Sequence, residues 1–249
     1  VRIDPDGKVL SERYDYCEGR PFEQLKQILA ELLEGDELTE PVQIAFTGSG
    51  GKLASEILGG IYVNEIISQS AAVSHLYPEV RTVIEMGGED SKLILMNGSD
   101  SEANCLSDFE LNTICAAGTG SFLDQQAKRI GVSIEEEFGA LALKSKKPPR
   151  IAGRCSVFAK SDIQPLLNEG AAKEDIAASI FQSIVTQTIS GLACGRPIKG
   201  KIAFLGGPLY FLSELRQRFI ETLNLTQDQI IFPPNSHYFV AIVAAFSSL

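Results

Sequence analysis

Three glycine-rich segments stand where strands are expected to end. Residues 84–92 read Ile-Glu-Met-Gly-Gly-Glu-Asp-Ser-Lys, so Gly87 and Gly88 follow an apolar run. Gly118-Thr119-Gly120 precedes a helical pattern, and Gly206-Gly207-Pro208 follows a second apolar run. Glycine lets backbone N–H groups approach a phosphate without interference from a Cβ atom. Together the three segments predict a phosphate-binding site.

Polar residues beside these glycines add possible chemistry. Glu89 and Asp90 have the oxygen ligands that would position Mg²⁺ or an attacking water, and Ser91 adds a hydroxyl. An ordinary hairpin turn with solvated charges is the alternative for this segment taken alone.

The second segment lies at an expected helix N-terminus. Unsatisfied N–H groups and the helix dipole make Gly118-Thr119-Gly120 a candidate anion site. The alternative is a helix start that Thr119 or Ser121 caps with its hydroxyl.

Five cysteines stand at positions 17, 105, 115, 155 and 194. Their odd number and wide spacing argue against a disulfide framework, and no zinc-ribbon spacing occurs, so buried free thiols are the simplest interpretation. Cys115 and Cys155 differ because each precedes an expected helix, where thiol pKa values fall. Two thiolates are half of what a [4Fe-4S] cluster needs, and a two-fold dimer would supply the rest. On spacing alone, two structural thiols remain the alternative.

Charge and composition exclude several functions. The chain has 249 residues, 44% hydrophobic, and its 22 Lys and Arg against 32 Asp and Glu give a net charge of −10. A nucleic-acid or anionic-membrane binder needs a basic face, and no basic cluster suggests one. The longest apolar run, Phe239–Phe246, is shorter than the about 20 residues of a membrane span. No signal-peptide pattern opens the chain, so we expect a cytoplasmic protein.

Apolar periodicity predicts alternating strands and helices. The expected strands are 1–3, 8–16, 42–46, 81–85, 91–96, 105–111, 201–205 and 230–232. The expected helices are 22–33, 52–58, 68–76, 119–130, 157–167, 173–193, 213–223 and 238–246.

Antiparallel strands followed by helices occur twice in succession. This order predicts a duplicated α/β fold, with a first half at 1–78 closed by helix 237–249 and a second half at 79–236. The chain begins inside an expected hairpin, so we expect a fragment of a longer protein whose first half lacks its opening strand.

Four phrases resemble one protein family in their order along the chain. They are Gly-Gly-Glu-Asp-Ser-Lys, Cys-Ala-Ala-Gly-Thr-Gly-Ser-Phe-Leu-Asp, Cys-Ser-Val-Phe-Ala-Lys-Ser-Asp-Ile and Leu-Gly-Gly. The chain thereby resembles the activases of 2-hydroxyacyl-CoA dehydratases and the ATPase subunits of benzoyl-CoA reductase, from about Thr47 onward. It looks most like the activase part of very long multidomain relatives.

The resemblance implies an actin/hexokinase-like fold of two ribonuclease-H-like halves that binds ATP and Mg²⁺. It also implies a homodimer with one [4Fe-4S] cluster, for which Cys115 and Cys155 match the ligands. Residues 87–90 match a phosphate motif and Gly206-Gly207 the adenosine motif. The implied reaction is ATP-driven electron transfer, from reduced ferredoxin or flavodoxin, to a partner dehydratase or reductase, which is either a separate protein or part of the same full-length chain.

Departures from the family pattern keep alternatives open. The first phosphate motif, Asp-x-Gly-Ser-Thr, has no counterpart here, so we expect residues 1–249 alone to hydrolyse ATP weakly or not at all. Glu89 stands where many relatives have Gln, and Pro208-Leu209-Tyr210 replaces Val-Ala-x-Asn. A small-molecule kinase of the same superfamily is one alternative, although no catalytic Asp motif occurs around 47–65. A catalytically silent nucleotide-binding module of a larger protein is the other.

Overall fold

The computed structural model describes residues 1–249 except 7, 18, 34–41, 99–104, 113–117, 152–155 and 249, and it describes only the backbone of 156 and 157. The described chain divides into two compact units. Unit 1 comprises residues 1–76 and 238–249, and unit 2 comprises residues 77–237. That these units are ribonuclease-H-like halves stays a prediction.

Unit 1 contains two small sheets and four helices. Strands β1 (Arg2–Ile3) and β2 (Val9–Ser11) form an antiparallel hairpin, and β3 (Ala45–Phe46) pairs in parallel with β4 (Ile61–Tyr62). The helices are α1 (Pro21–Leu32), α2 (Gly51–Leu58), α3 (Glu65–Leu76) and α10 (Phe239–Phe246). The strands expected at 8–16 and 42–46 are therefore shorter than the apolar pattern indicated.

Unit 2 is built on a five-stranded sheet of order β7-β6-β5-β8-β9. Its strands are β5 (Val80–Met86), β6 (Ser91–Asn97), β7 (Cys105–Asn112), β8 (Lys201–Leu205) and β9 (Ile230–Ile231). The first three form an antiparallel meander, whereas β8 runs parallel to β5 and to β9. Because β5 and β8 are parallel neighbours, the glycines that follow them must emerge at the same end of the sheet.

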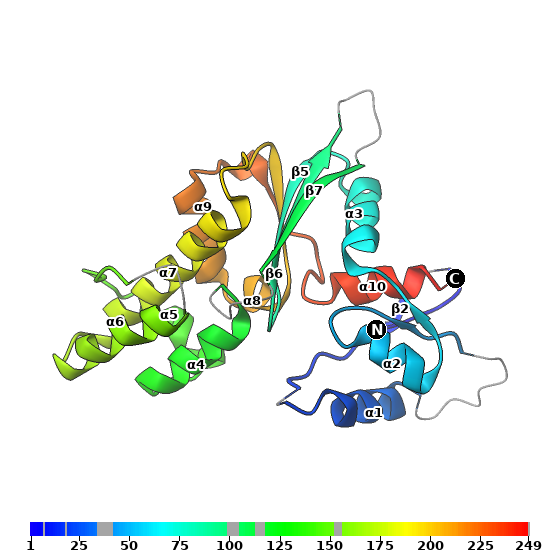
Figure 1. The fold of residues 1–249 in the computed structure, drawn as a ribbon, viewed down its shortest axis with the longest axis horizontal. Helices are drawn as coiled ribbons and strands as arrows, with labels where there is room; N and C mark the ends of the chain where they lie inside the picture. Colours follow the sequence, from blue (N-terminus) through cyan, green and yellow to red (C-terminus); the bar gives the residue numbers. More distant parts are fainter. Residues whose placement is uncertain are drawn as a thin grey trace. The chain divides into compact units, whose positions relative to one another are not determined.

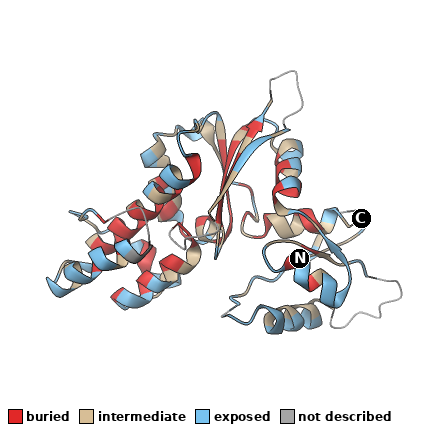
Figure 2. Ribbon diagram, viewed as in Figure 1, coloured by how far each residue is buried: buried red, intermediate tan, exposed pale blue. Residues whose placement is uncertain are grey.

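Helices pack on one face of this sheet (Figure 1). They are α4 (Gly120–Ile130), α5 (Gly139–Ala142), α6 (Ser156–Asn168), α7 (Lys173–Ala193), α8 (Gly207–Phe211) and α9 (Ser213–Leu223), with a π-helix at Ile134–Phe138 and a 3₁₀-helix at Gln227–Gln229. Figure 2 shows the buried residues concentrated where helices and sheet meet. Phe138 and Phe181 are both fully buried there, with ring centroids 5.0 Å apart in an edge-to-face arrangement.

Helix α7 is the central helix of unit 2. It is the one helix in the described ranges that is long and apolar enough to cross a membrane, but 67% of its most apolar window is buried inside the protein. Packing against Ile84, Leu93 and Phe204 in one hydrophobic core accounts for that apolarity.

Candidate nucleotide site and cysteine-bearing segments

The structure brings the three glycine segments together at one end of the unit 2 sheet. The Gly120 N–H donates to the Gly87 carbonyl at 2.9 Å, and the Ser121 N–H donates to the Gly88 carbonyl at 2.8 Å. A Cβ atom on Gly120 would lie only 2.9 Å from Pro208 Cγ. Helices α4 and α8 accordingly begin beside the lower end of the sheet in Figure 1.

Position 206 requires a glycine, because the backbone after β8 passes very close to the backbone at the end of β5. Its φ is +94°, which side chains rarely adopt, and a Cβ atom there would collide with the carbonyl oxygen of Met86. The Gly206 N–H donates to the Ser236 carbonyl at 2.9 Å, which holds the segment after β9 against the strand end. Only glycine fits between these two backbones.

The start of α4 differs from the expected anion site. The N–H groups of Gly120 and Ser121 already donate to carbonyls, so they are not the unsatisfied donors that the sequence pattern suggested. Thr119 is the N-cap residue with an extended backbone, but its side chain makes no capping hydrogen bond. The backbone pairing instead joins α4 rigidly to the Gly87-Gly88 turn. Gly88 is exposed, and nothing lies within 4 Å of the place that its Cβ atom would occupy, so a ligand can approach the turn there.

A buried ion triad supports the same turn. Lys92 lies opposite Glu85 across the β5–β6 pair, and its Nζ is 2.8 Å from Glu85 Oε2. The same Nζ is 2.9 Å from Asp90 Oδ1. Side-chain exposure is 4% for Lys92 and 7% for Glu85 against 18% for Asp90, so Asp90 is the member that reaches the surface. Lys92 thus fixes the position of the Asp90 carboxylate, whereas Glu89 at the tip of the turn is exposed.

Two buried hydroxyls converge beside Gly118. Ser91 Oγ and Thr188 Oγ1 have no hydrogen-bond partner within the described ranges, although both residues are buried. A Cβ atom on Gly118 would lie 3.0 Å from Thr188 Oγ1 and 3.7 Å from both Ser91 Oγ and Asn112 Nδ2. The absence of a side chain at Gly118 therefore lets these hydroxyls lie close to its backbone. Thr188 and Asn112 were not expected from the sequence, because nothing local marks them.

Cys115 and Cys155 lie outside the described residues, but the helices that follow them are informative. Lys160 Nζ in α6 donates to Gln125 Oε1 in α4 at 2.8 Å. One turn further along both helices, Arg129 Nη1 donates to Gln164 Oε1 at 3.4 Å. The numbering offset is the same in both contacts and both helices advance together, so α4 and α6 are parallel neighbours (Figure 1). The N-terminal ends of α4 and α6 thus lie at the same end of the helix pair.

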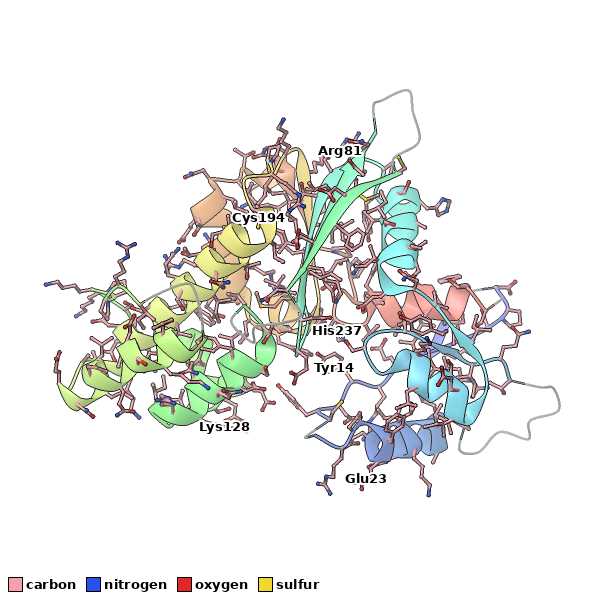
Figure 3. All side chains as sticks on the ribbon, in the orientation of Figure 1. Tyr14, Glu23, Arg81, Lys128, Cys194 and His237 are labelled. Carbon is pink, nitrogen blue, oxygen red and sulfur yellow. The ribbon has the colours of Figure 1, made fainter. Side chains whose placement is uncertain are left out.

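The other three cysteines correct the sequence interpretation. Cys17, Cys105 and Cys194 are free thiols, as expected, but they are exposed rather than buried. Cys194 directly follows α7 in a left-handed backbone conformation, and Figure 3 labels it there. No group of three or more His, Cys, Asp or Glu side chains suited to a metal ion occurs in the described part of the chain.

An aromatic cluster surrounds the third glycine segment. His237 stacks on Tyr210 of α8 with ring centroids 3.8 Å apart, and Figure 3 shows His237 near the lower end of the sheet. His237 stands just before the last helix, where a cap or a surface group is the usual interpretation of a histidine. Its ring instead stacks on Tyr210, because the hydrogen bond from Gly206 to Ser236 brings the two segments together.

Comparison with known proteins decides the family. Residues 4–247 match the BadF/BadG/BcrA/BcrD ATPase family, which is nearly the whole chain. The chain belongs to this ATPase family. The resemblance read from the four sequence phrases is thereby confirmed.

Individual members of the BadF/BadG/BcrA/BcrD ATPase family agree in fold. The activator of the 2-hydroxyisocaproyl-CoA dehydratase from Clostridium difficile, solved with bound ADPNP, superposes with a TM-score of 0.76 at 28% identity over 90% of this chain and 80% of that one. Component A of the Acidaminococcus fermentans (R)-2-hydroxyglutaryl-CoA dehydratase superposes with a TM-score of 0.70 at 31% identity, over 82% of this chain and 74% of that one. The expected actin-like α/β fold is confirmed by these structures.

Coverage of family members varies. The match to the Clostridioides difficile 2-hydroxyisocaproyl-CoA dehydratase activator is 34% identical over 145 residues, which are 58% of this chain and 52% of that protein. The matched part of this chain therefore spans about half the length of that relative.

Replacing Gly120 with alanine is expected to lower the free energy of unfolding by about 1–3 kcal/mol, because the new methyl group would press on Pro208 Cγ and lie 3.4 Å from both Gly87 O and Gly88 Cα. Urea denaturation measures the change. Gly88→Ala is the control, since its methyl group enters open space. Equal losses in the two variants would contradict the close packing of α4 on the turn.

Proposed function

We propose that this chain is the activase part of a protein that, when intact, hydrolyses ATP and delivers one electron to an acyl-CoA dehydratase or reductase. The observation that carries the proposal is the convergence of the three glycine segments beside a parallel pair of helices, each preceded by a cysteine. Membership of an ATPase family supports the nucleotide part. Relatives named as dehydratase activators support the choice of partner.

The end of the unit 2 sheet where the glycine segments meet would bind ATP. Gly87 and Gly88 would offer backbone to its phosphates at the carboxyl end of β5, and Gly206, Gly207 and Pro208 would offer backbone to its adenosine at the end of β8. The Ser91 and Thr188 hydroxyls beside Gly118, which have no hydrogen-bond partner in the described residues, would donate to an oxygen atom of water or phosphate. Thr119 and Gly120 would bring the start of α4 to the same site through the backbone bonds to the turn.

The acidic residues would serve the metal and the attacking water. Asp90 Oδ1 is occupied by Lys92, so Mg²⁺ or its bound water would approach the other oxygen. Glu89 is exposed at the tip of the turn and would orient the water that attacks the terminal phosphate. Lys92 itself is a positioning residue, because it contacts carboxylates rather than the open surface.

The cysteines would hold the electron carrier. Cys115 and Cys155 of two subunits would ligate one [4Fe-4S] cluster, which accepts and donates single electrons when bound. The parallel N-termini of α4 and α6 favour anionic thiolates at one end of the helix pair. A homodimer, a reduced ferredoxin or flavodoxin as donor, and a cytoplasmic location complete the proposal. The backbone clamp between Gly120 and Gly87 would couple the nucleotide to the Cys115 segment.

ATP hydrolysis by the purified intact protein tests the nucleotide part. Asp90→Asn is expected to lower kcat by on the order of 100-fold, because the Mg²⁺-facing charge is lost while the shape of the side chain is kept. Asp6→Asn, an exposed change in the β1–β2 hairpin, is the matched control and should retain the wild-type rate. Absence of ATP hydrolysis and of ATP binding by the wild-type protein would contradict the proposal.

A further inference from the structure

We infer that a pocket along helix α7 is the docking site for an extended acidic segment of the partner dehydratase or reductase. The inference rests on the proposed function, because it names the surface that receives that partner. The described residues that line this α7 pocket are separate from the three glycine segments.

The α7 pocket has a volume of about 950 Å³, and its described lining residues all belong to unit 2. They come from one side of α7, from α6, from residues 148–151 and from α9. Helices α6 and α9 both pack against α7. A volume of this size is at the upper end of the range in which proteins hold ligands.

Helix α7 offers hydrogen-bond acceptors to the pocket. The hydroxyls of Ser179, Ser183 and Ser190 line it, and each donates to a backbone carbonyl of the same helix, at 2.8, 2.9 and 2.7 Å. Because their hydrogens are used, the oxygen atoms of these hydroxyls remain as acceptors. A ligand that matches them must bring N–H donors, which a peptide backbone has and a simple anion lacks.

The spacing of these acceptors suits an extended chain. Ser179 and Ser183 are one helical turn apart, which is about 6 Å at 1.5 Å per residue. N–H groups on one side of an extended strand repeat every two residues, or about 6.6 Å. From Ser179 to Ser190 the helix advances about 16 Å, which is the length of about five extended residues.

The charged residues of the pocket favour acidic side chains. Arg150 and Arg218 line it from two different elements, against Asp162 as the one acid among its described lining residues. Arg218 is also 3.1 Å from Glu221, but side-chain exposures of 36% and 49% make that pair weak. The exposed pair Lys146-Lys147 lies in the same loop as Arg150. In a chain with a net charge of −10, this local excess of cations attracts carboxylates.

The loop that carries Arg150 is held in place before a ligand binds. Asp175 in the first turn of α7 accepts from the Ser145 hydroxyl at 2.7 Å. The same carboxylate oxygen accepts from the backbone N–H groups of Lys146 and Lys147 at 2.8 and 3.0 Å. A loop that is already ordered loses less conformational entropy on binding, which favours recognition of a flexible segment.

The pocket also connects the two ends of the proposed mechanism. Ile151 and Phe158 line it, and Cys155 lies between them in the sequence. Helix α9, which carries Arg218, follows α8 after a single residue, and α8 begins at Gly207. A protein bound here would contact elements joined to both the cysteine segment and the nucleotide site. This connection suits the partner that receives the electron, because delivery to it is the step that ATP drives in the proposed function.

Binding of fluorescently labelled hexaglutamate, measured by anisotropy at low salt, tests the inference. Arg150→Glu combined with Arg218→Glu is expected to weaken binding about tenfold or more, because two attractive charges become repulsive. Lys8→Glu combined with Lys26→Glu is the matched control, since both lysines are exposed in unit 1 and the net charge changes equally. The control should retain the wild-type affinity. No binding by the wild-type protein, or equal weakening in both double variants, would overturn the inference.

Two further ligands distinguish a docking segment from a simple anion site. Hexaglutamate methylated at its backbone nitrogens cannot donate to the serine oxygens, so it should bind wild type more weakly than hexaglutamate does. Citrate should displace hexaglutamate poorly, because it has carboxylates but neither the length nor the N–H groups of a peptide. Equal affinity for the two peptides, or displacement by citrate at an equal concentration of carboxylate, would also overturn the inference.

Electron transfer in the intact protein identifies the occupant. Hexaglutamate should slow delivery of the electron to the dehydratase or reductase and leave reduction by the donor protein unchanged. Slower reduction by the donor would assign the pocket to the donor, and a changed oligomeric state of the arginine double variant in sedimentation would assign it to a second copy of the chain. Either result would overturn the choice of partner.

Failure of this inference is distinguishable from failure of the proposed function. The peptide measurements use neither ATP nor iron, so a negative result there leaves the proposed function standing. If the protein binds hexaglutamate through the two arginines but binds neither ATP nor iron, the proposed function is contradicted, and the identity of the partner fails with it.

Discussion

Replacing Lys92 with methionine is expected to lower the free energy of unfolding by about 3–5 kcal/mol. Lys92 is 3% exposed and pairs with Glu85 at 2.8 Å and with Asp90 at 2.9 Å. Removing the ammonium leaves two carboxylates close together, one of them buried, with no cation between them. A buried charge that loses its partner keeps the full penalty of having been taken out of water.

A double variant shows whether the pair acts as a unit. Lys92→Met combined with Glu85→Met removes both buried charges, and apolar residues in place of a buried ion pair are often neutral. We therefore expect the double variant to recover most of the loss in urea denaturation. Arg196→Met is the matched control, because Arg196 also contacts two acids, Asp108 and Glu110, but at the surface. Exposed pairs are worth about 0–1 kcal/mol.

Similar losses in Lys92→Met and Arg196→Met would contradict a buried triad. The outcome also bears on the candidate site, because Lys92 sets the place of Asp90. If the protein keeps its stability without Lys92, this residue is not needed to hold the Gly87-Gly88 turn. The proposed role of Lys92 in positioning Asp90 would then be contradicted as well.

Much of the unit 2 fold could be predicted from local pattern. Helix α7 was expected at its observed bounds, because a long apolar periodicity lies between polar breaks. Strand β8 is a nearly continuous apolar run, and β5 is buried along almost its whole length although it contains Arg81, Thr82 and Glu85. Both strands are followed by paired glycines, and such burial is typical of neighbouring parallel strands. Their parallel pairing places Gly87 and Gly206 at one end of the sheet, so the motifs alone located the candidate edge.

Other features depend on contacts that no local pattern encodes. Helix α8 was missed because its five residues carry too little periodicity to be recognised. The N–H groups of Gly120 and Ser121 could not be known to be occupied, because their acceptors are about 30 residues earlier. Thr188 reaches Gly118 from a helix that reads as ordinary core. Such residues are found only from tertiary packing.

Cys115→Ala and Cys155→Ala are each expected to abolish iron binding by the anaerobically purified protein. The reason lies in the described helices. The contacts from Lys160 to Gln125 and from Arg129 to Gln164 keep α4 and α6 parallel, so their positive N-terminal ends lie together. Residue 155 immediately precedes α6, and residue 115 stands five positions before α4. In the proposed dimer each chain would supply two thiolates to a cluster that takes four, so the loss of either cysteine would remove two ligands from the shared site.

Iron content per chain and the visible absorbance of the cluster measure the effect. Cys105→Ala and Cys194→Ala are the matched controls, because both thiols are free and exposed, and both variants should bind as much iron as wild type. The variants should also unfold at the wild-type urea concentration in the iron-free state, which separates a lost ligand from a lost fold.

Breaking the helix pair with Lys160→Ala and Arg129→Ala tests the geometric premise separately. It should weaken iron retention while all five thiols remain, because the two segments would no longer enter at one fixed end. Wild-type iron content in either Cys115→Ala or Cys155→Ala would contradict the assignment, and the candidate nucleotide site would then have to serve a reaction other than electron transfer.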